Sequence, residues 1–526
     1  MVQNYLPFDF EPTDQQRRAI EHVHGPMLVV AGAGTGKTTV LSRRIAQLID
    51  SGAAEPDEIL AVTYTRNAAA ELIARVGGIL HPQLDRQRAA RKLMASGLQA
   101  NTFHAYCYGL LRDSGISFGL IDDTDLLILL RQRIAELKLE HYIKASEPGT
   151  FLEELLKFVR RCHDELRTPD DYDNYVARLE RKELPLPRMG KSKDAAVMGA
   201  EQVLGRCREL ARVFRFTEDL LKREGLGTFG HILTRAVELL GRRRSLLERA
   251  QRRARFILID EFQDSNIAQL KVTSLLAGAE ANVFAVGDPD QAIYRFRGAT
   301  SGIFEEFLAT FGPGRVQRVS MSQNRRSTPP VLRCAYQAIS CNPVVKLQAG
   351  EWKREPLECL RLKEEPELAN APAVQVIVHN GCEQEAEFVV DTIEAMRRQR
   401  PVMPLRDFAV LYHLHNHRDA VVAELRRRGI ATAVRGADRF ETPEVRDAVA
   451  ALRLVEGPNP IALFRVAALP QFRVEPERFR AELALAGRNG SAEAALEKSG
   501  PGREVMDLVR ESRREVAEAK GDLWRR

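Results

Sequence analysis

The chain has 526 residues, of which 44% are hydrophobic and 29% are charged, a balance typical of a folded protein with several domains and not of a disordered chain. Its formal charge of +6 is compatible with nucleic-acid binding but does not by itself indicate it. Seven cysteines without a CxxC pair exclude a disulfide scaffold and a cysteine-rich metal site and favour a cytoplasmic location. The sequence shows no secretory signal and no apolar run of the ~18 residues that cross a bilayer, so we expect no membrane partner.

Short apolar runs alternate along the chain with helix-periodic stretches, which is the pattern of an α/β fold with parallel strands. Several of these runs end directly in glycine, threonine or aspartate, so polar residues follow the carboxyl ends of the strands. In an open parallel sheet, ligands bind at that edge. The predicted strands cover residues 27–31, 59–63, 256–259, 283–286, 374–378 and 408–412.

The composition changes at three places along the chain. Residues 123–179 are charged and helix-periodic, which indicates a helical insertion between the first two strands and the later ones. Residues 342–372 are rich in proline, glutamate and lysine and suit a linker into another α/β domain. From Gly457 onward the pattern is helical again.

The segment from Ala31 to Thr38 reads AGAGTGKT and lies between an apolar strand and a helical pattern. Its glycines allow backbone N–H groups to surround phosphate oxygens at a helix N-terminus, Lys37 would reach the β- and γ-phosphates, and the Thr38 hydroxyl would bind Mg2+. The alternative is a glycine-rich turn with a fortuitous GKT. We expect ATP to be bound by Ala31, Gly32, Ala33, Gly34, Thr35, Gly36, Lys37, Thr38 and Thr39.

Residues 256–264 read FILIDEFQD, an apolar strand that ends in two adjacent acids. Asp260 suits Mg2+, and Glu261 suits a base that orients the attacking water. Acids often do no more than terminate a strand. Together with a phosphate loop, however, the pair predicts nucleotide hydrolysis.

The strand at 283–286 runs into GDPDQAIYRFRGA. Gln291 lies just past the strand end, where it could sense a γ-phosphate. Tyr294, Phe296 and Arg297 then bring two aromatic rings and a cation close together. The alternative is that both rings belong to the hydrophobic core.

The motifs of this chain resemble those of superfamily 1 helicases of the UvrD/Rep/PcrA type. They occur in the same order, as AGAGTGKT, AVTYTRNAAAEL (61–72), TFHAYCYGLLR (102–112), LIDEFQD, GDPDQAIYRFRGA and SQNRRST (322–328). A weaker likeness covers 386–393, 408–412 and 435–447. The resemblance implies an ATP-driven motor that moves 3′ to 5′ on single-stranded DNA and separates duplex DNA in repair or recombination.

The resemblance also implies the P-loop NTPase fold class, with two RecA-like lobes that each carry a helical insertion. We therefore expect residues 1–112 and 228–335 to form the first lobe and residues 113–227 to form its insertion. Residues 336–456 are expected to form an incomplete second lobe, and residues 457–526 the start of its insertion.

The resemblance assigns further roles residue by residue. Gln16 matches the glutamine that reads the adenine edge, and Arg326 matches the arginine that reaches the γ-phosphate from across the cleft. Gln291 matches the residue that links the γ-phosphate to the DNA face. The residues matching contacts with single-stranded DNA are Thr63, Tyr64, Thr65, Phe103, His104, Tyr294 and Phe296, with Arg297 holding their loop.

The chain departs from the family pattern at several positions. Phe296 stands where tryptophan is usual, Arg325 where tyrosine is usual, and Asn67 where lysine is usual. No HxxKGLE-like or ExxRLxYVAxTRA-like segment follows Arg326. We therefore expect a protein partner or a further C-terminal portion to complete the second lobe.

Two other features allow alternative interpretations. The segment 242–255 carries seven arginines and one glutamate, which suits either a DNA-contacting patch or a solvated helix face. His413, His415, His417 and Asp419 alternate, so a strand there would present four metal ligands on one face, whereas a loop and helix would leave a surface feature.

Three functions compete on this reading. The first is a DNA-translocating ATPase and helicase. The second is an ATP- and DNA-binding subunit with little turnover, because the last two motifs are missing. The third, a P-loop ATPase acting on proteins or small molecules, is disfavoured by the aromatic set, while RNA remains an alternative to DNA because stacking does not read the 2′-hydroxyl.

Overall fold

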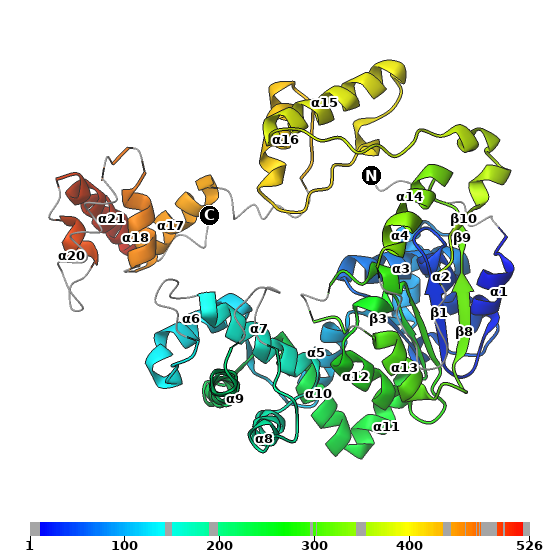
Figure 1. Cartoon of the computed structure of the whole chain (residues 1–526), viewed down its shortest axis with the longest axis horizontal. Helices are drawn as coiled ribbons and strands as arrows, with labels where there is room; N and C mark the ends of the chain where they lie inside the picture. The colour runs from blue at the N-terminus through cyan, green and yellow to red at the C-terminus, as the bar shows by residue number, and fades with distance from the viewer. Residues whose placement is uncertain are drawn as a thin grey trace. The chain divides into compact units, whose positions relative to one another are not determined.

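The structure is a computed structural model of the whole chain (Figure 1). It describes residues 11–142, 150–188, 198–294, 298–300, 302–342, 354–434, 443–457, 459–469, 471–472, 474, 492–497 and 500–518. The chain forms two compact units, residues 1–375 and residues 376–526.

A six-stranded parallel sheet with the strand order β3-β2-β6-β7-β1-β8 forms the centre of the first unit. Near one edge of the sheet, Val29 lies between Val286 and Val319 of the two neighbouring strands. Because all strands run the same way, their carboxyl ends meet at one edge. The strands are β1 (Met27–Ala31), β2 (Ile59–Val62), β3 (Gln99–Asn101), β6 (Phe256–Ile259), β7 (Val283–Gly287) and β8 (Gln317–Met321).

The four predicted strands of this unit are confirmed to within a residue, whereas β3 and β8 were not predicted. Both lie at the edges of the sheet. The sequence QAN of β3 is half-buried and β8 alternates between exposed and buried positions, so neither gives the continuous apolar run of a strand that is covered on both faces.

Helices cover both faces of the sheet (Figure 1). Side chains alternate along each strand, so Leu28 and Val30 join one hydrophobic cluster and Val29 joins the other. The helices on the Leu28 side are α5 (Phe103–Asp113), α10 (Phe229–Arg242), α11 (Arg244–Arg253), α12 (Ile267–Ala277) and α13 (Ile303–Phe311). Those on the Val29 side are α1 (Asp14–Glu21), α2 (Lys37–Asp50), α3 (Arg66–Leu80) and α4 (Arg86–Ala95).

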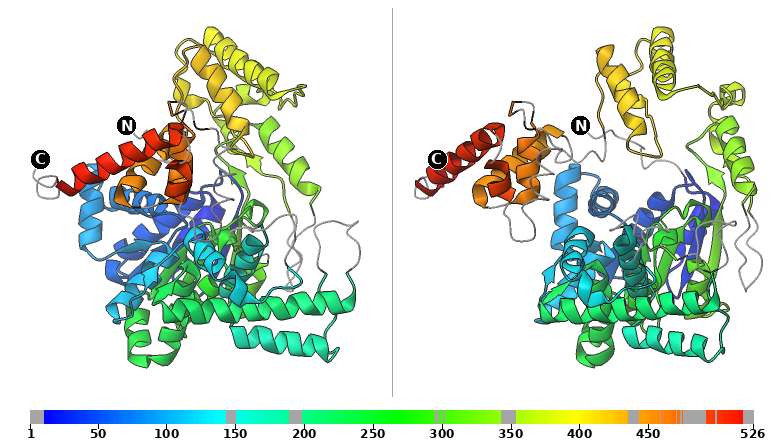
Figure 2. Two further views of the ribbon diagram at one scale, coloured as in Figure 1. Left: turned by 90° about the vertical axis from the view of Figure 1, so that its left-hand side faces the viewer. Right: turned by 60° about the vertical axis from the view of Figure 1, so that its left-hand side comes forward.

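A helical insertion with its own core lies between β3 and β6 in the sequence. Leu155, Leu210 and Val213 pack together inside it. Its helices are α6 (Asp123–Gln132), α7 (Thr150–Asp164), α8 (Pro169–Glu180) and α9 (Ala200–Arg223), and α8 and α9 run side by side (Figure 2). A short parallel pair, β4 (Gly119–Leu120) and β5 (Leu226–Gly227), joins the points where the chain leaves and returns.

The first unit also contains α14 (Pro329–Ser340) and a short parallel pair of strands beyond β8. This pair consists of β9 (Gln323–Asn324) and β10 (Glu358–Cys359). The pairing places residues 358–359 beside residues 323–324, which follow β8 in the sequence.

The second unit contains only helices and irregular segments among its described residues. Its helices are α15 (Cys382–Gln399), α16 (His417–Arg427), α17 (Pro443–Glu456), α18 (Pro460–Ala467), α20 (Ala492–Glu497) and α21 (Gly500–Glu518). Val390, Ile393 and Leu425 join α15 to α16, and a separate cluster that includes Leu454 and Val505 joins α17, α18, α20 and α21.

The prediction of strands at 374–378 and 408–412 is therefore wrong for this structure. Both segments are irregular and largely exposed, with Val376 at 91% and Leu411 at 94% exposure. A strand needs a neighbour that satisfies its backbone groups, and the described part of the chain pairs neither segment with one. The apolar pattern is present, but the described residues of the second unit form no sheet.

Among the described residues, no helix is both long enough and apolar enough to cross a membrane.

Candidate functional site

The phosphate-loop segment connects β1 to α2 at the carboxyl edge of the sheet. Gly34 and Gly36 adopt left-handed backbone conformations, with φ of 74° and 90°, which other residues adopt only at a cost. Inside the loop, the Thr35 hydroxyl donates a hydrogen bond to the Gly32 carbonyl over 2.8 Å. The turn therefore delivers the chain directly into the N-terminus of α2, where the helix dipole favours an anion.

Three consecutive carbonyl oxygens of this loop accept hydrogen bonds from outside it. The Asn324 side-chain amide donates to the Ala33 carbonyl over 2.5 Å, and the Arg325 backbone N–H donates to the Gly34 carbonyl over 3.0 Å. The Gln16 side-chain amide donates to the Thr35 carbonyl over 2.9 Å. With these carbonyls bound on the outside, the loop is held in one conformation from both α1 and the segment after β8.

The predicted Mg2+ ligands lie next to each other. The Thr38 hydroxyl is 3.4 Å from an Asp260 carboxylate oxygen, so a hydroxyl and a carboxylate, both of them oxygen donors that Mg2+ prefers, face one point. Burial, and secondly the charge of Glu261, raises the pKa of Asp260 to about 6. A cation at this point would relieve that cost, so the residues fit Mg2+.

The predicted catalytic acid faces the phosphate-loop lysine. Lys37 Nζ is 3.4 Å from a Glu261 carboxylate oxygen, and Glu261 itself has φ of 49°. This left-handed conformation of a non-glycine residue is a strained turn, and the backbone N–H of Glu261 donates to the Asp260 carboxylate over 3.0 Å. The turn thus places adjacent acids beside different partners, Asp260 beside Thr38 and Glu261 beside Lys37.

A chain of hydrogen bonds runs from Glu261 to the next strand end. The Gln263 side-chain amide donates to the Glu261 carboxylate over 2.8 Å, and its carbonyl oxygen accepts from the Asp288 backbone N–H over 2.9 Å. Asp288 in turn accepts from the Gln291 side-chain amide over 2.5 Å. Gln291 is therefore joined to the predicted base through Gln263 and Asp288.

Asp290, beside Gln291, is bound by an arginine from the C-terminal part of the first unit's sequence. Arg354 makes two parallel contacts with the Asp290 carboxylate, at 2.7 and 2.5 Å, and also donates to the Ile339 carbonyl at the end of α14 over 2.9 Å. A bidentate contact of this kind holds both direction and distance. Arg354 therefore ties the Gln291 turn to α14.

The predicted DNA-contact residues fall into an exposed and a buried group. Tyr64 and Tyr294 stack with ring centroids 5.1 Å apart, and Tyr64 and Thr65 are exposed at the carboxyl end of β2. Thr63 and Phe103, in contrast, are buried at 2% and 8% exposure. The Thr63 hydroxyl donates to the Thr65 carbonyl and Phe103 packs in the core, so neither offers the surface that a base would need.

The remaining residues of the predicted set have mixed positions. His104 packs edge to face against Phe229, and burial lowers the pKa of His104. Arg326 is exposed beside the phosphate loop, where a Cβ added to Gly34 would lie 2.7 Å from the Arg326 Cβ. Phe296 and Arg297 lie outside the described residues. Thr39 is partly buried in the first turn of α2.

The structure decides between the two interpretations for only one of the two ambiguous surface features. His413 and His415 lie in a turn and His417 begins α16, so these exposed side chains do not share the face of a strand. Among the described residues, the candidate metal-ligand group lies elsewhere, in the first unit. The arginines of 242–255 are exposed along α10 and α11, which is compatible with both interpretations.

Sequence reasoning missed several residues of the site, namely Gln263, Asp288, Asn324 and Arg354. The first three lie within motifs that were recognised, as polar residues next to the assigned ones. Arg354 had no local signal, because its partner Asp290 is 64 positions away.

Two family models of known proteins match consecutive parts of this chain. The family model described as UvrD/REP helicase N-terminal domain matches residues 12–312, and the model described as UvrD-like helicase C-terminal domain matches residues 319–481.

Individual relatives are similar to most of this chain. DNA helicase II of Haemophilus influenzae is 30% identical over 465 residues, which are 86% of this chain and 55% of that protein. ATP-dependent DNA helicase Rep of Escherichia coli is 28% identical over 470 residues, 88% of this chain and 61% of that protein. ATP-dependent DNA helicase PcrA of Staphylococcus epidermidis is 27% identical over 472 residues, 88% and 56% of the two chains.

The chain thus spans little more than half the length of these relatives. Since the first family model alone matches more than half of the 526 residues, the chain belongs to the UvrD/REP helicase family.

Proposed function

We propose that this chain is the ATP-hydrolysing part of a DNA motor, one that moves 3′ to 5′ on single-stranded DNA and unwinds duplex DNA in repair or recombination. The observation that carries the proposal is the hydrogen-bonded path from Glu261 through Gln263 and Asp288 to Gln291. This path ends three residues before Tyr294, which stacks on Tyr64. A nucleotide site and an aromatic surface for bases are thereby connected within one unit.

In this proposal the residues of the phosphate loop hold ATP. The backbone N–H groups from Gly32 to Thr38 surround the phosphates, Lys37 binds the β- and γ-phosphates, and Gln16 and Thr39 lie beside the loop. Thr38 and Asp260 would hold Mg2+, and the ion would supply positive charge beside the phosphates.

The hydrolysis step uses Glu261 as the base. Its carboxylate takes a proton from the water whose oxygen attacks the γ-phosphorus, while the bond from that phosphorus to the β,γ-bridging oxygen breaks and ADP leaves. The ion pair with Lys37 holds the Glu261 carboxylate beside the phosphate loop. Arg326, beside Gly34, is placed to stabilise charge on the γ-phosphate.

The DNA surface that we propose is smaller than the predicted one. Tyr64, Thr65 and Tyr294 supply the exposed contacts, and His104 lies at the margin. Each aromatic ring can stack on any base, so binding would not depend on sequence. Thr63 and Phe103 would act by supporting the backbone beneath this surface.

The division into domains that we propose follows the predicted boundaries, with the first lobe at 1–112 and 228–335 and its insertion at 113–227. Residues 336–456 and 457–526 belong to a second lobe and its insertion. We propose that further strands, from a protein partner or additional chain, pair with 374–378 and 408–412. A cytoplasmic location fits seven cysteines that form no disulfide among the described residues.

The exposed segments at 374–378 and 408–412 favour a second candidate, an ATP- and DNA-binding subunit with little turnover of its own. One experiment separates the two. Steady-state ATP hydrolysis by the 526-residue chain is measured with and without single-stranded DNA, and the Lys37→Ala variant serves as the control for contaminating activity. Turnover that DNA stimulates in the parent chain but not in the Lys37→Ala variant would support the motor.

ATP and DNA binding without turnover would support the subunit. Failure to bind both ligands would overturn both candidates. Single-stranded RNA of the same length, used in parallel, tests whether the stimulation is specific for DNA.

A further inference from the structure

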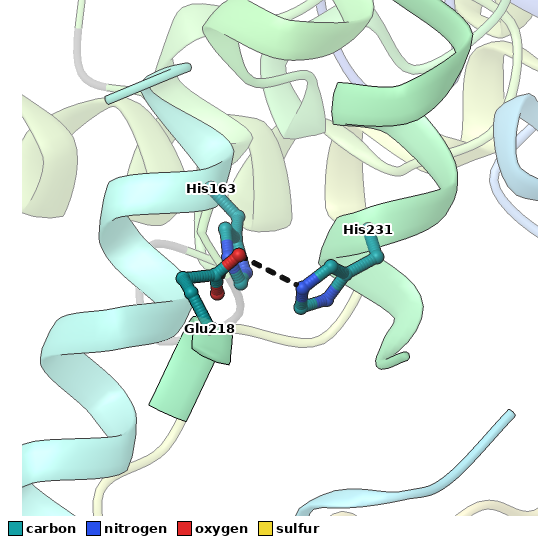
Figure 3. Close-up of side chains that lie close together, drawn as sticks. All are labelled: His163, Glu218 and His231. Atoms are coloured by element: carbon teal, nitrogen blue, oxygen red, sulfur yellow. Dashed lines mark hydrogen bonds and ion pairs between the residues drawn. The ribbon is translucent and has the colours of Figure 1, made fainter. Parts of the chain in front are cut away.

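Three side chains from three different helices, two of the insertion and one of the first lobe, meet at one point (Figure 3). His163 lies in the last turn of α7, Glu218 lies in α9, and His231 lies in the first turn of α10. The Nε2 atoms of His163 and His231 are 2.9 and 3.1 Å from the two oxygens of the Glu218 carboxylate. One donor atom from each residue lies within 4.8 Å of the other two.

This meeting depends on close packing of the helices. The centroids of the two imidazole rings are 4.5 Å apart, and both histidines are only 4% exposed. A Cβ added at Gly230 would lie 2.6 Å from His163 Nδ1, so a glycine is needed there for the first turn of α10 to approach α7. His163 also packs edge to face against Phe214 of α9. The three donors are therefore held in place by buried contacts and do not rely on exposed, mobile side chains.

The donor set has the chemistry of a transition-metal site. Two imidazole nitrogens and one carboxylate oxygen are ligands that Zn2+ and similar divalent ions accept together. Ligand bonds of ~2.0–2.1 Å in a tetrahedron put neighbouring donors about 3.3 Å apart. The two histidine–glutamate contacts of 2.9 and 3.1 Å would have to lengthen by a few tenths of an ångström, and the two imidazole donors, which lie within 4.8 Å of each other, would have to adopt the same spacing.

Two of the three proposed ligands, Glu218 and His231, line a cavity. The cavity has a volume of about 680 Å³, and residues of 116–118, α9 and α10 also line it. It would admit the ion and leave space for water at a fourth ligand position. Arg235 lines the same cavity, where its guanidinium lies over the Phe118 ring and donates to the Leu226 carbonyl over 3.3 Å.

The second nitrogen of His231 has a partner in either tautomer of the neutral imidazole. Without an ion, Nδ1 accepts a hydrogen bond from the Thr228 backbone N–H at 3.2 Å, and Nε2–H donates to Glu218. With an ion on Nε2, the proton lies on Nδ1 and is donated to the Thr228 hydroxyl, 3.0 Å away. The imidazole stays neutral in both states, and the second supplies the outer hydrogen bond that metal-bound histidines usually make.

We propose that His163, Glu218 and His231 form a binding site for one divalent transition-metal ion of the Zn2+ class. The ion would connect α7 and α9 of the insertion to α10 of the first lobe. This site is distinct from the Mg2+ position at Thr38 and Asp260, where the donors are a hydroxyl and a carboxylate.

The test is a titration of the metal-free, full-length chain with Zn2+ in the presence of a competing chelator. The principal variant is His231→Asn, because the asparagine amide can still accept from the Thr228 N–H but has no atom at the Nε2 position. Glu218→Gln is the second variant and removes the negative charge while keeping the shape. The matched control replaces three exposed histidines together, His413→Asn, His415→Asn and His417→Asn.

We expect one tight equivalent of Zn2+ per parent chain and per control chain. Either site variant should lose that equivalent, and Thr228→Val, which removes only the outer acceptor, should weaken it about 10–100-fold. Added Zn2+ should raise the melting temperature of the parent and the control but not of the site variants. If one variant fails to fold in chelator, the other carries the test.

Three results would overturn the proposal. One is the absence of a tight equivalent in the parent chain, which would leave an ion-free hydrogen-bonded triad. Another is unchanged binding in both site variants. The third is loss of binding in the control, which would assign the metal to the exposed histidines.

Discussion

The side-chain amide of Asn266 donates a hydrogen bond of 2.7 Å to Asp164, which joins residues 102 positions apart. Asp164 ends α7 in the insertion, and Asn266 caps α12 shortly after the Asp260 and Glu261 pair. In the same turn of α7, Arg161 donates to the Gly298 carbonyl over 3.0 Å. The insertion thus contacts both the segment after the acid pair and the end of the segment that carries Tyr294.

This contact should make Asp164 important for stability. At pH 5, where the Asp164 carboxyl is mostly protonated in the folded chain, Asp164→Ala leaves the Asn266 amide buried without its acceptor, which should lower the free energy of unfolding by about 1–3 kcal/mol. Denaturant unfolding of the full chain measures the change. The control is Asp123→Ala, which removes a surface ion pair with Arg160 and should cost less than about 1 kcal/mol. Equal losses would show that the buried contact contributes nothing special.

The same residue should give the stability a defined pH dependence. Burial raises the pKa of Asp164 from 3.8 to about 6, so the folded state binds the proton more tightly than the unfolded state. Stability from this group is therefore gained as the pH falls from above 6 to below 4. The free energy of unfolding of the parent chain should rise, relative to Asp164→Asn, over that interval.

Denaturation of both proteins from pH 7 to pH 4, with chelator present, checks this prediction. The pKa values of Asp260 and Asp264 are also raised to about 6, but these groups titrate in both proteins and cancel in the difference. A constant difference between parent and variant would mean that Asp164 titrates normally.

Tyr294 should matter for DNA binding through its ring. Replacing it with alanine removes the ring that stacks on Tyr64 and should weaken binding of single-stranded DNA by about 1–3 kcal/mol, with ATP affinity unchanged. Fluorescence anisotropy with labelled oligonucleotide and nucleotide checks both quantities. Tyr294→Phe keeps the ring and is the matched control. Loss of ATP affinity instead would assign Tyr294 to the nucleotide site.

Glu261→Gln should separate nucleotide binding from hydrolysis. The amide keeps the size of the side chain but cannot take a proton from water, so turnover should fall by about 10²–10⁴-fold. ATP binding should remain close to that of the parent chain. Glu280→Gln, which changes an exposed acid outside the site, is the control for the loss of one charge. Unchanged turnover in Glu261→Gln would remove this residue as the base.

Gln263 should transmit the effect of DNA on hydrolysis. Gln263→Ala breaks the contacts with both Glu261 and the Asp288 backbone, so we expect DNA stimulation of ATP hydrolysis to fall more than basal hydrolysis. The control is Gln251→Ala, which removes another side-chain amide that donates to the backbone, in this case to the Leu275 carbonyl. A proportional fall in basal and stimulated rates would indicate a purely structural role for Gln263.

The sequence by itself determined the α/β class, the four central strands and the position of the phosphate loop. These features are encoded in short segments of the sequence. An apolar run that is covered on both faces and a glycine-rich turn before a helix can each be recognised from a few consecutive residues. The edge strands β3 and β8 were not predicted, because a strand that is only partly covered needs fewer apolar residues. The same local signal wrongly predicted strands at 374–378 and 408–412, which pair with no strand in the part of the chain that the structure describes.

Only the tertiary structure decided which residues come together. Phe103 and Tyr64 look equally suited to stacking in the sequence, but packing buries the first and exposes the second. The Asp290–Arg354 contact, the Asp164–Asn266 contact and the His163–Glu218–His231 group each join distant parts of the chain. Such contacts arise when packed helices bring side chains into range, and no local pattern of residues records that distance.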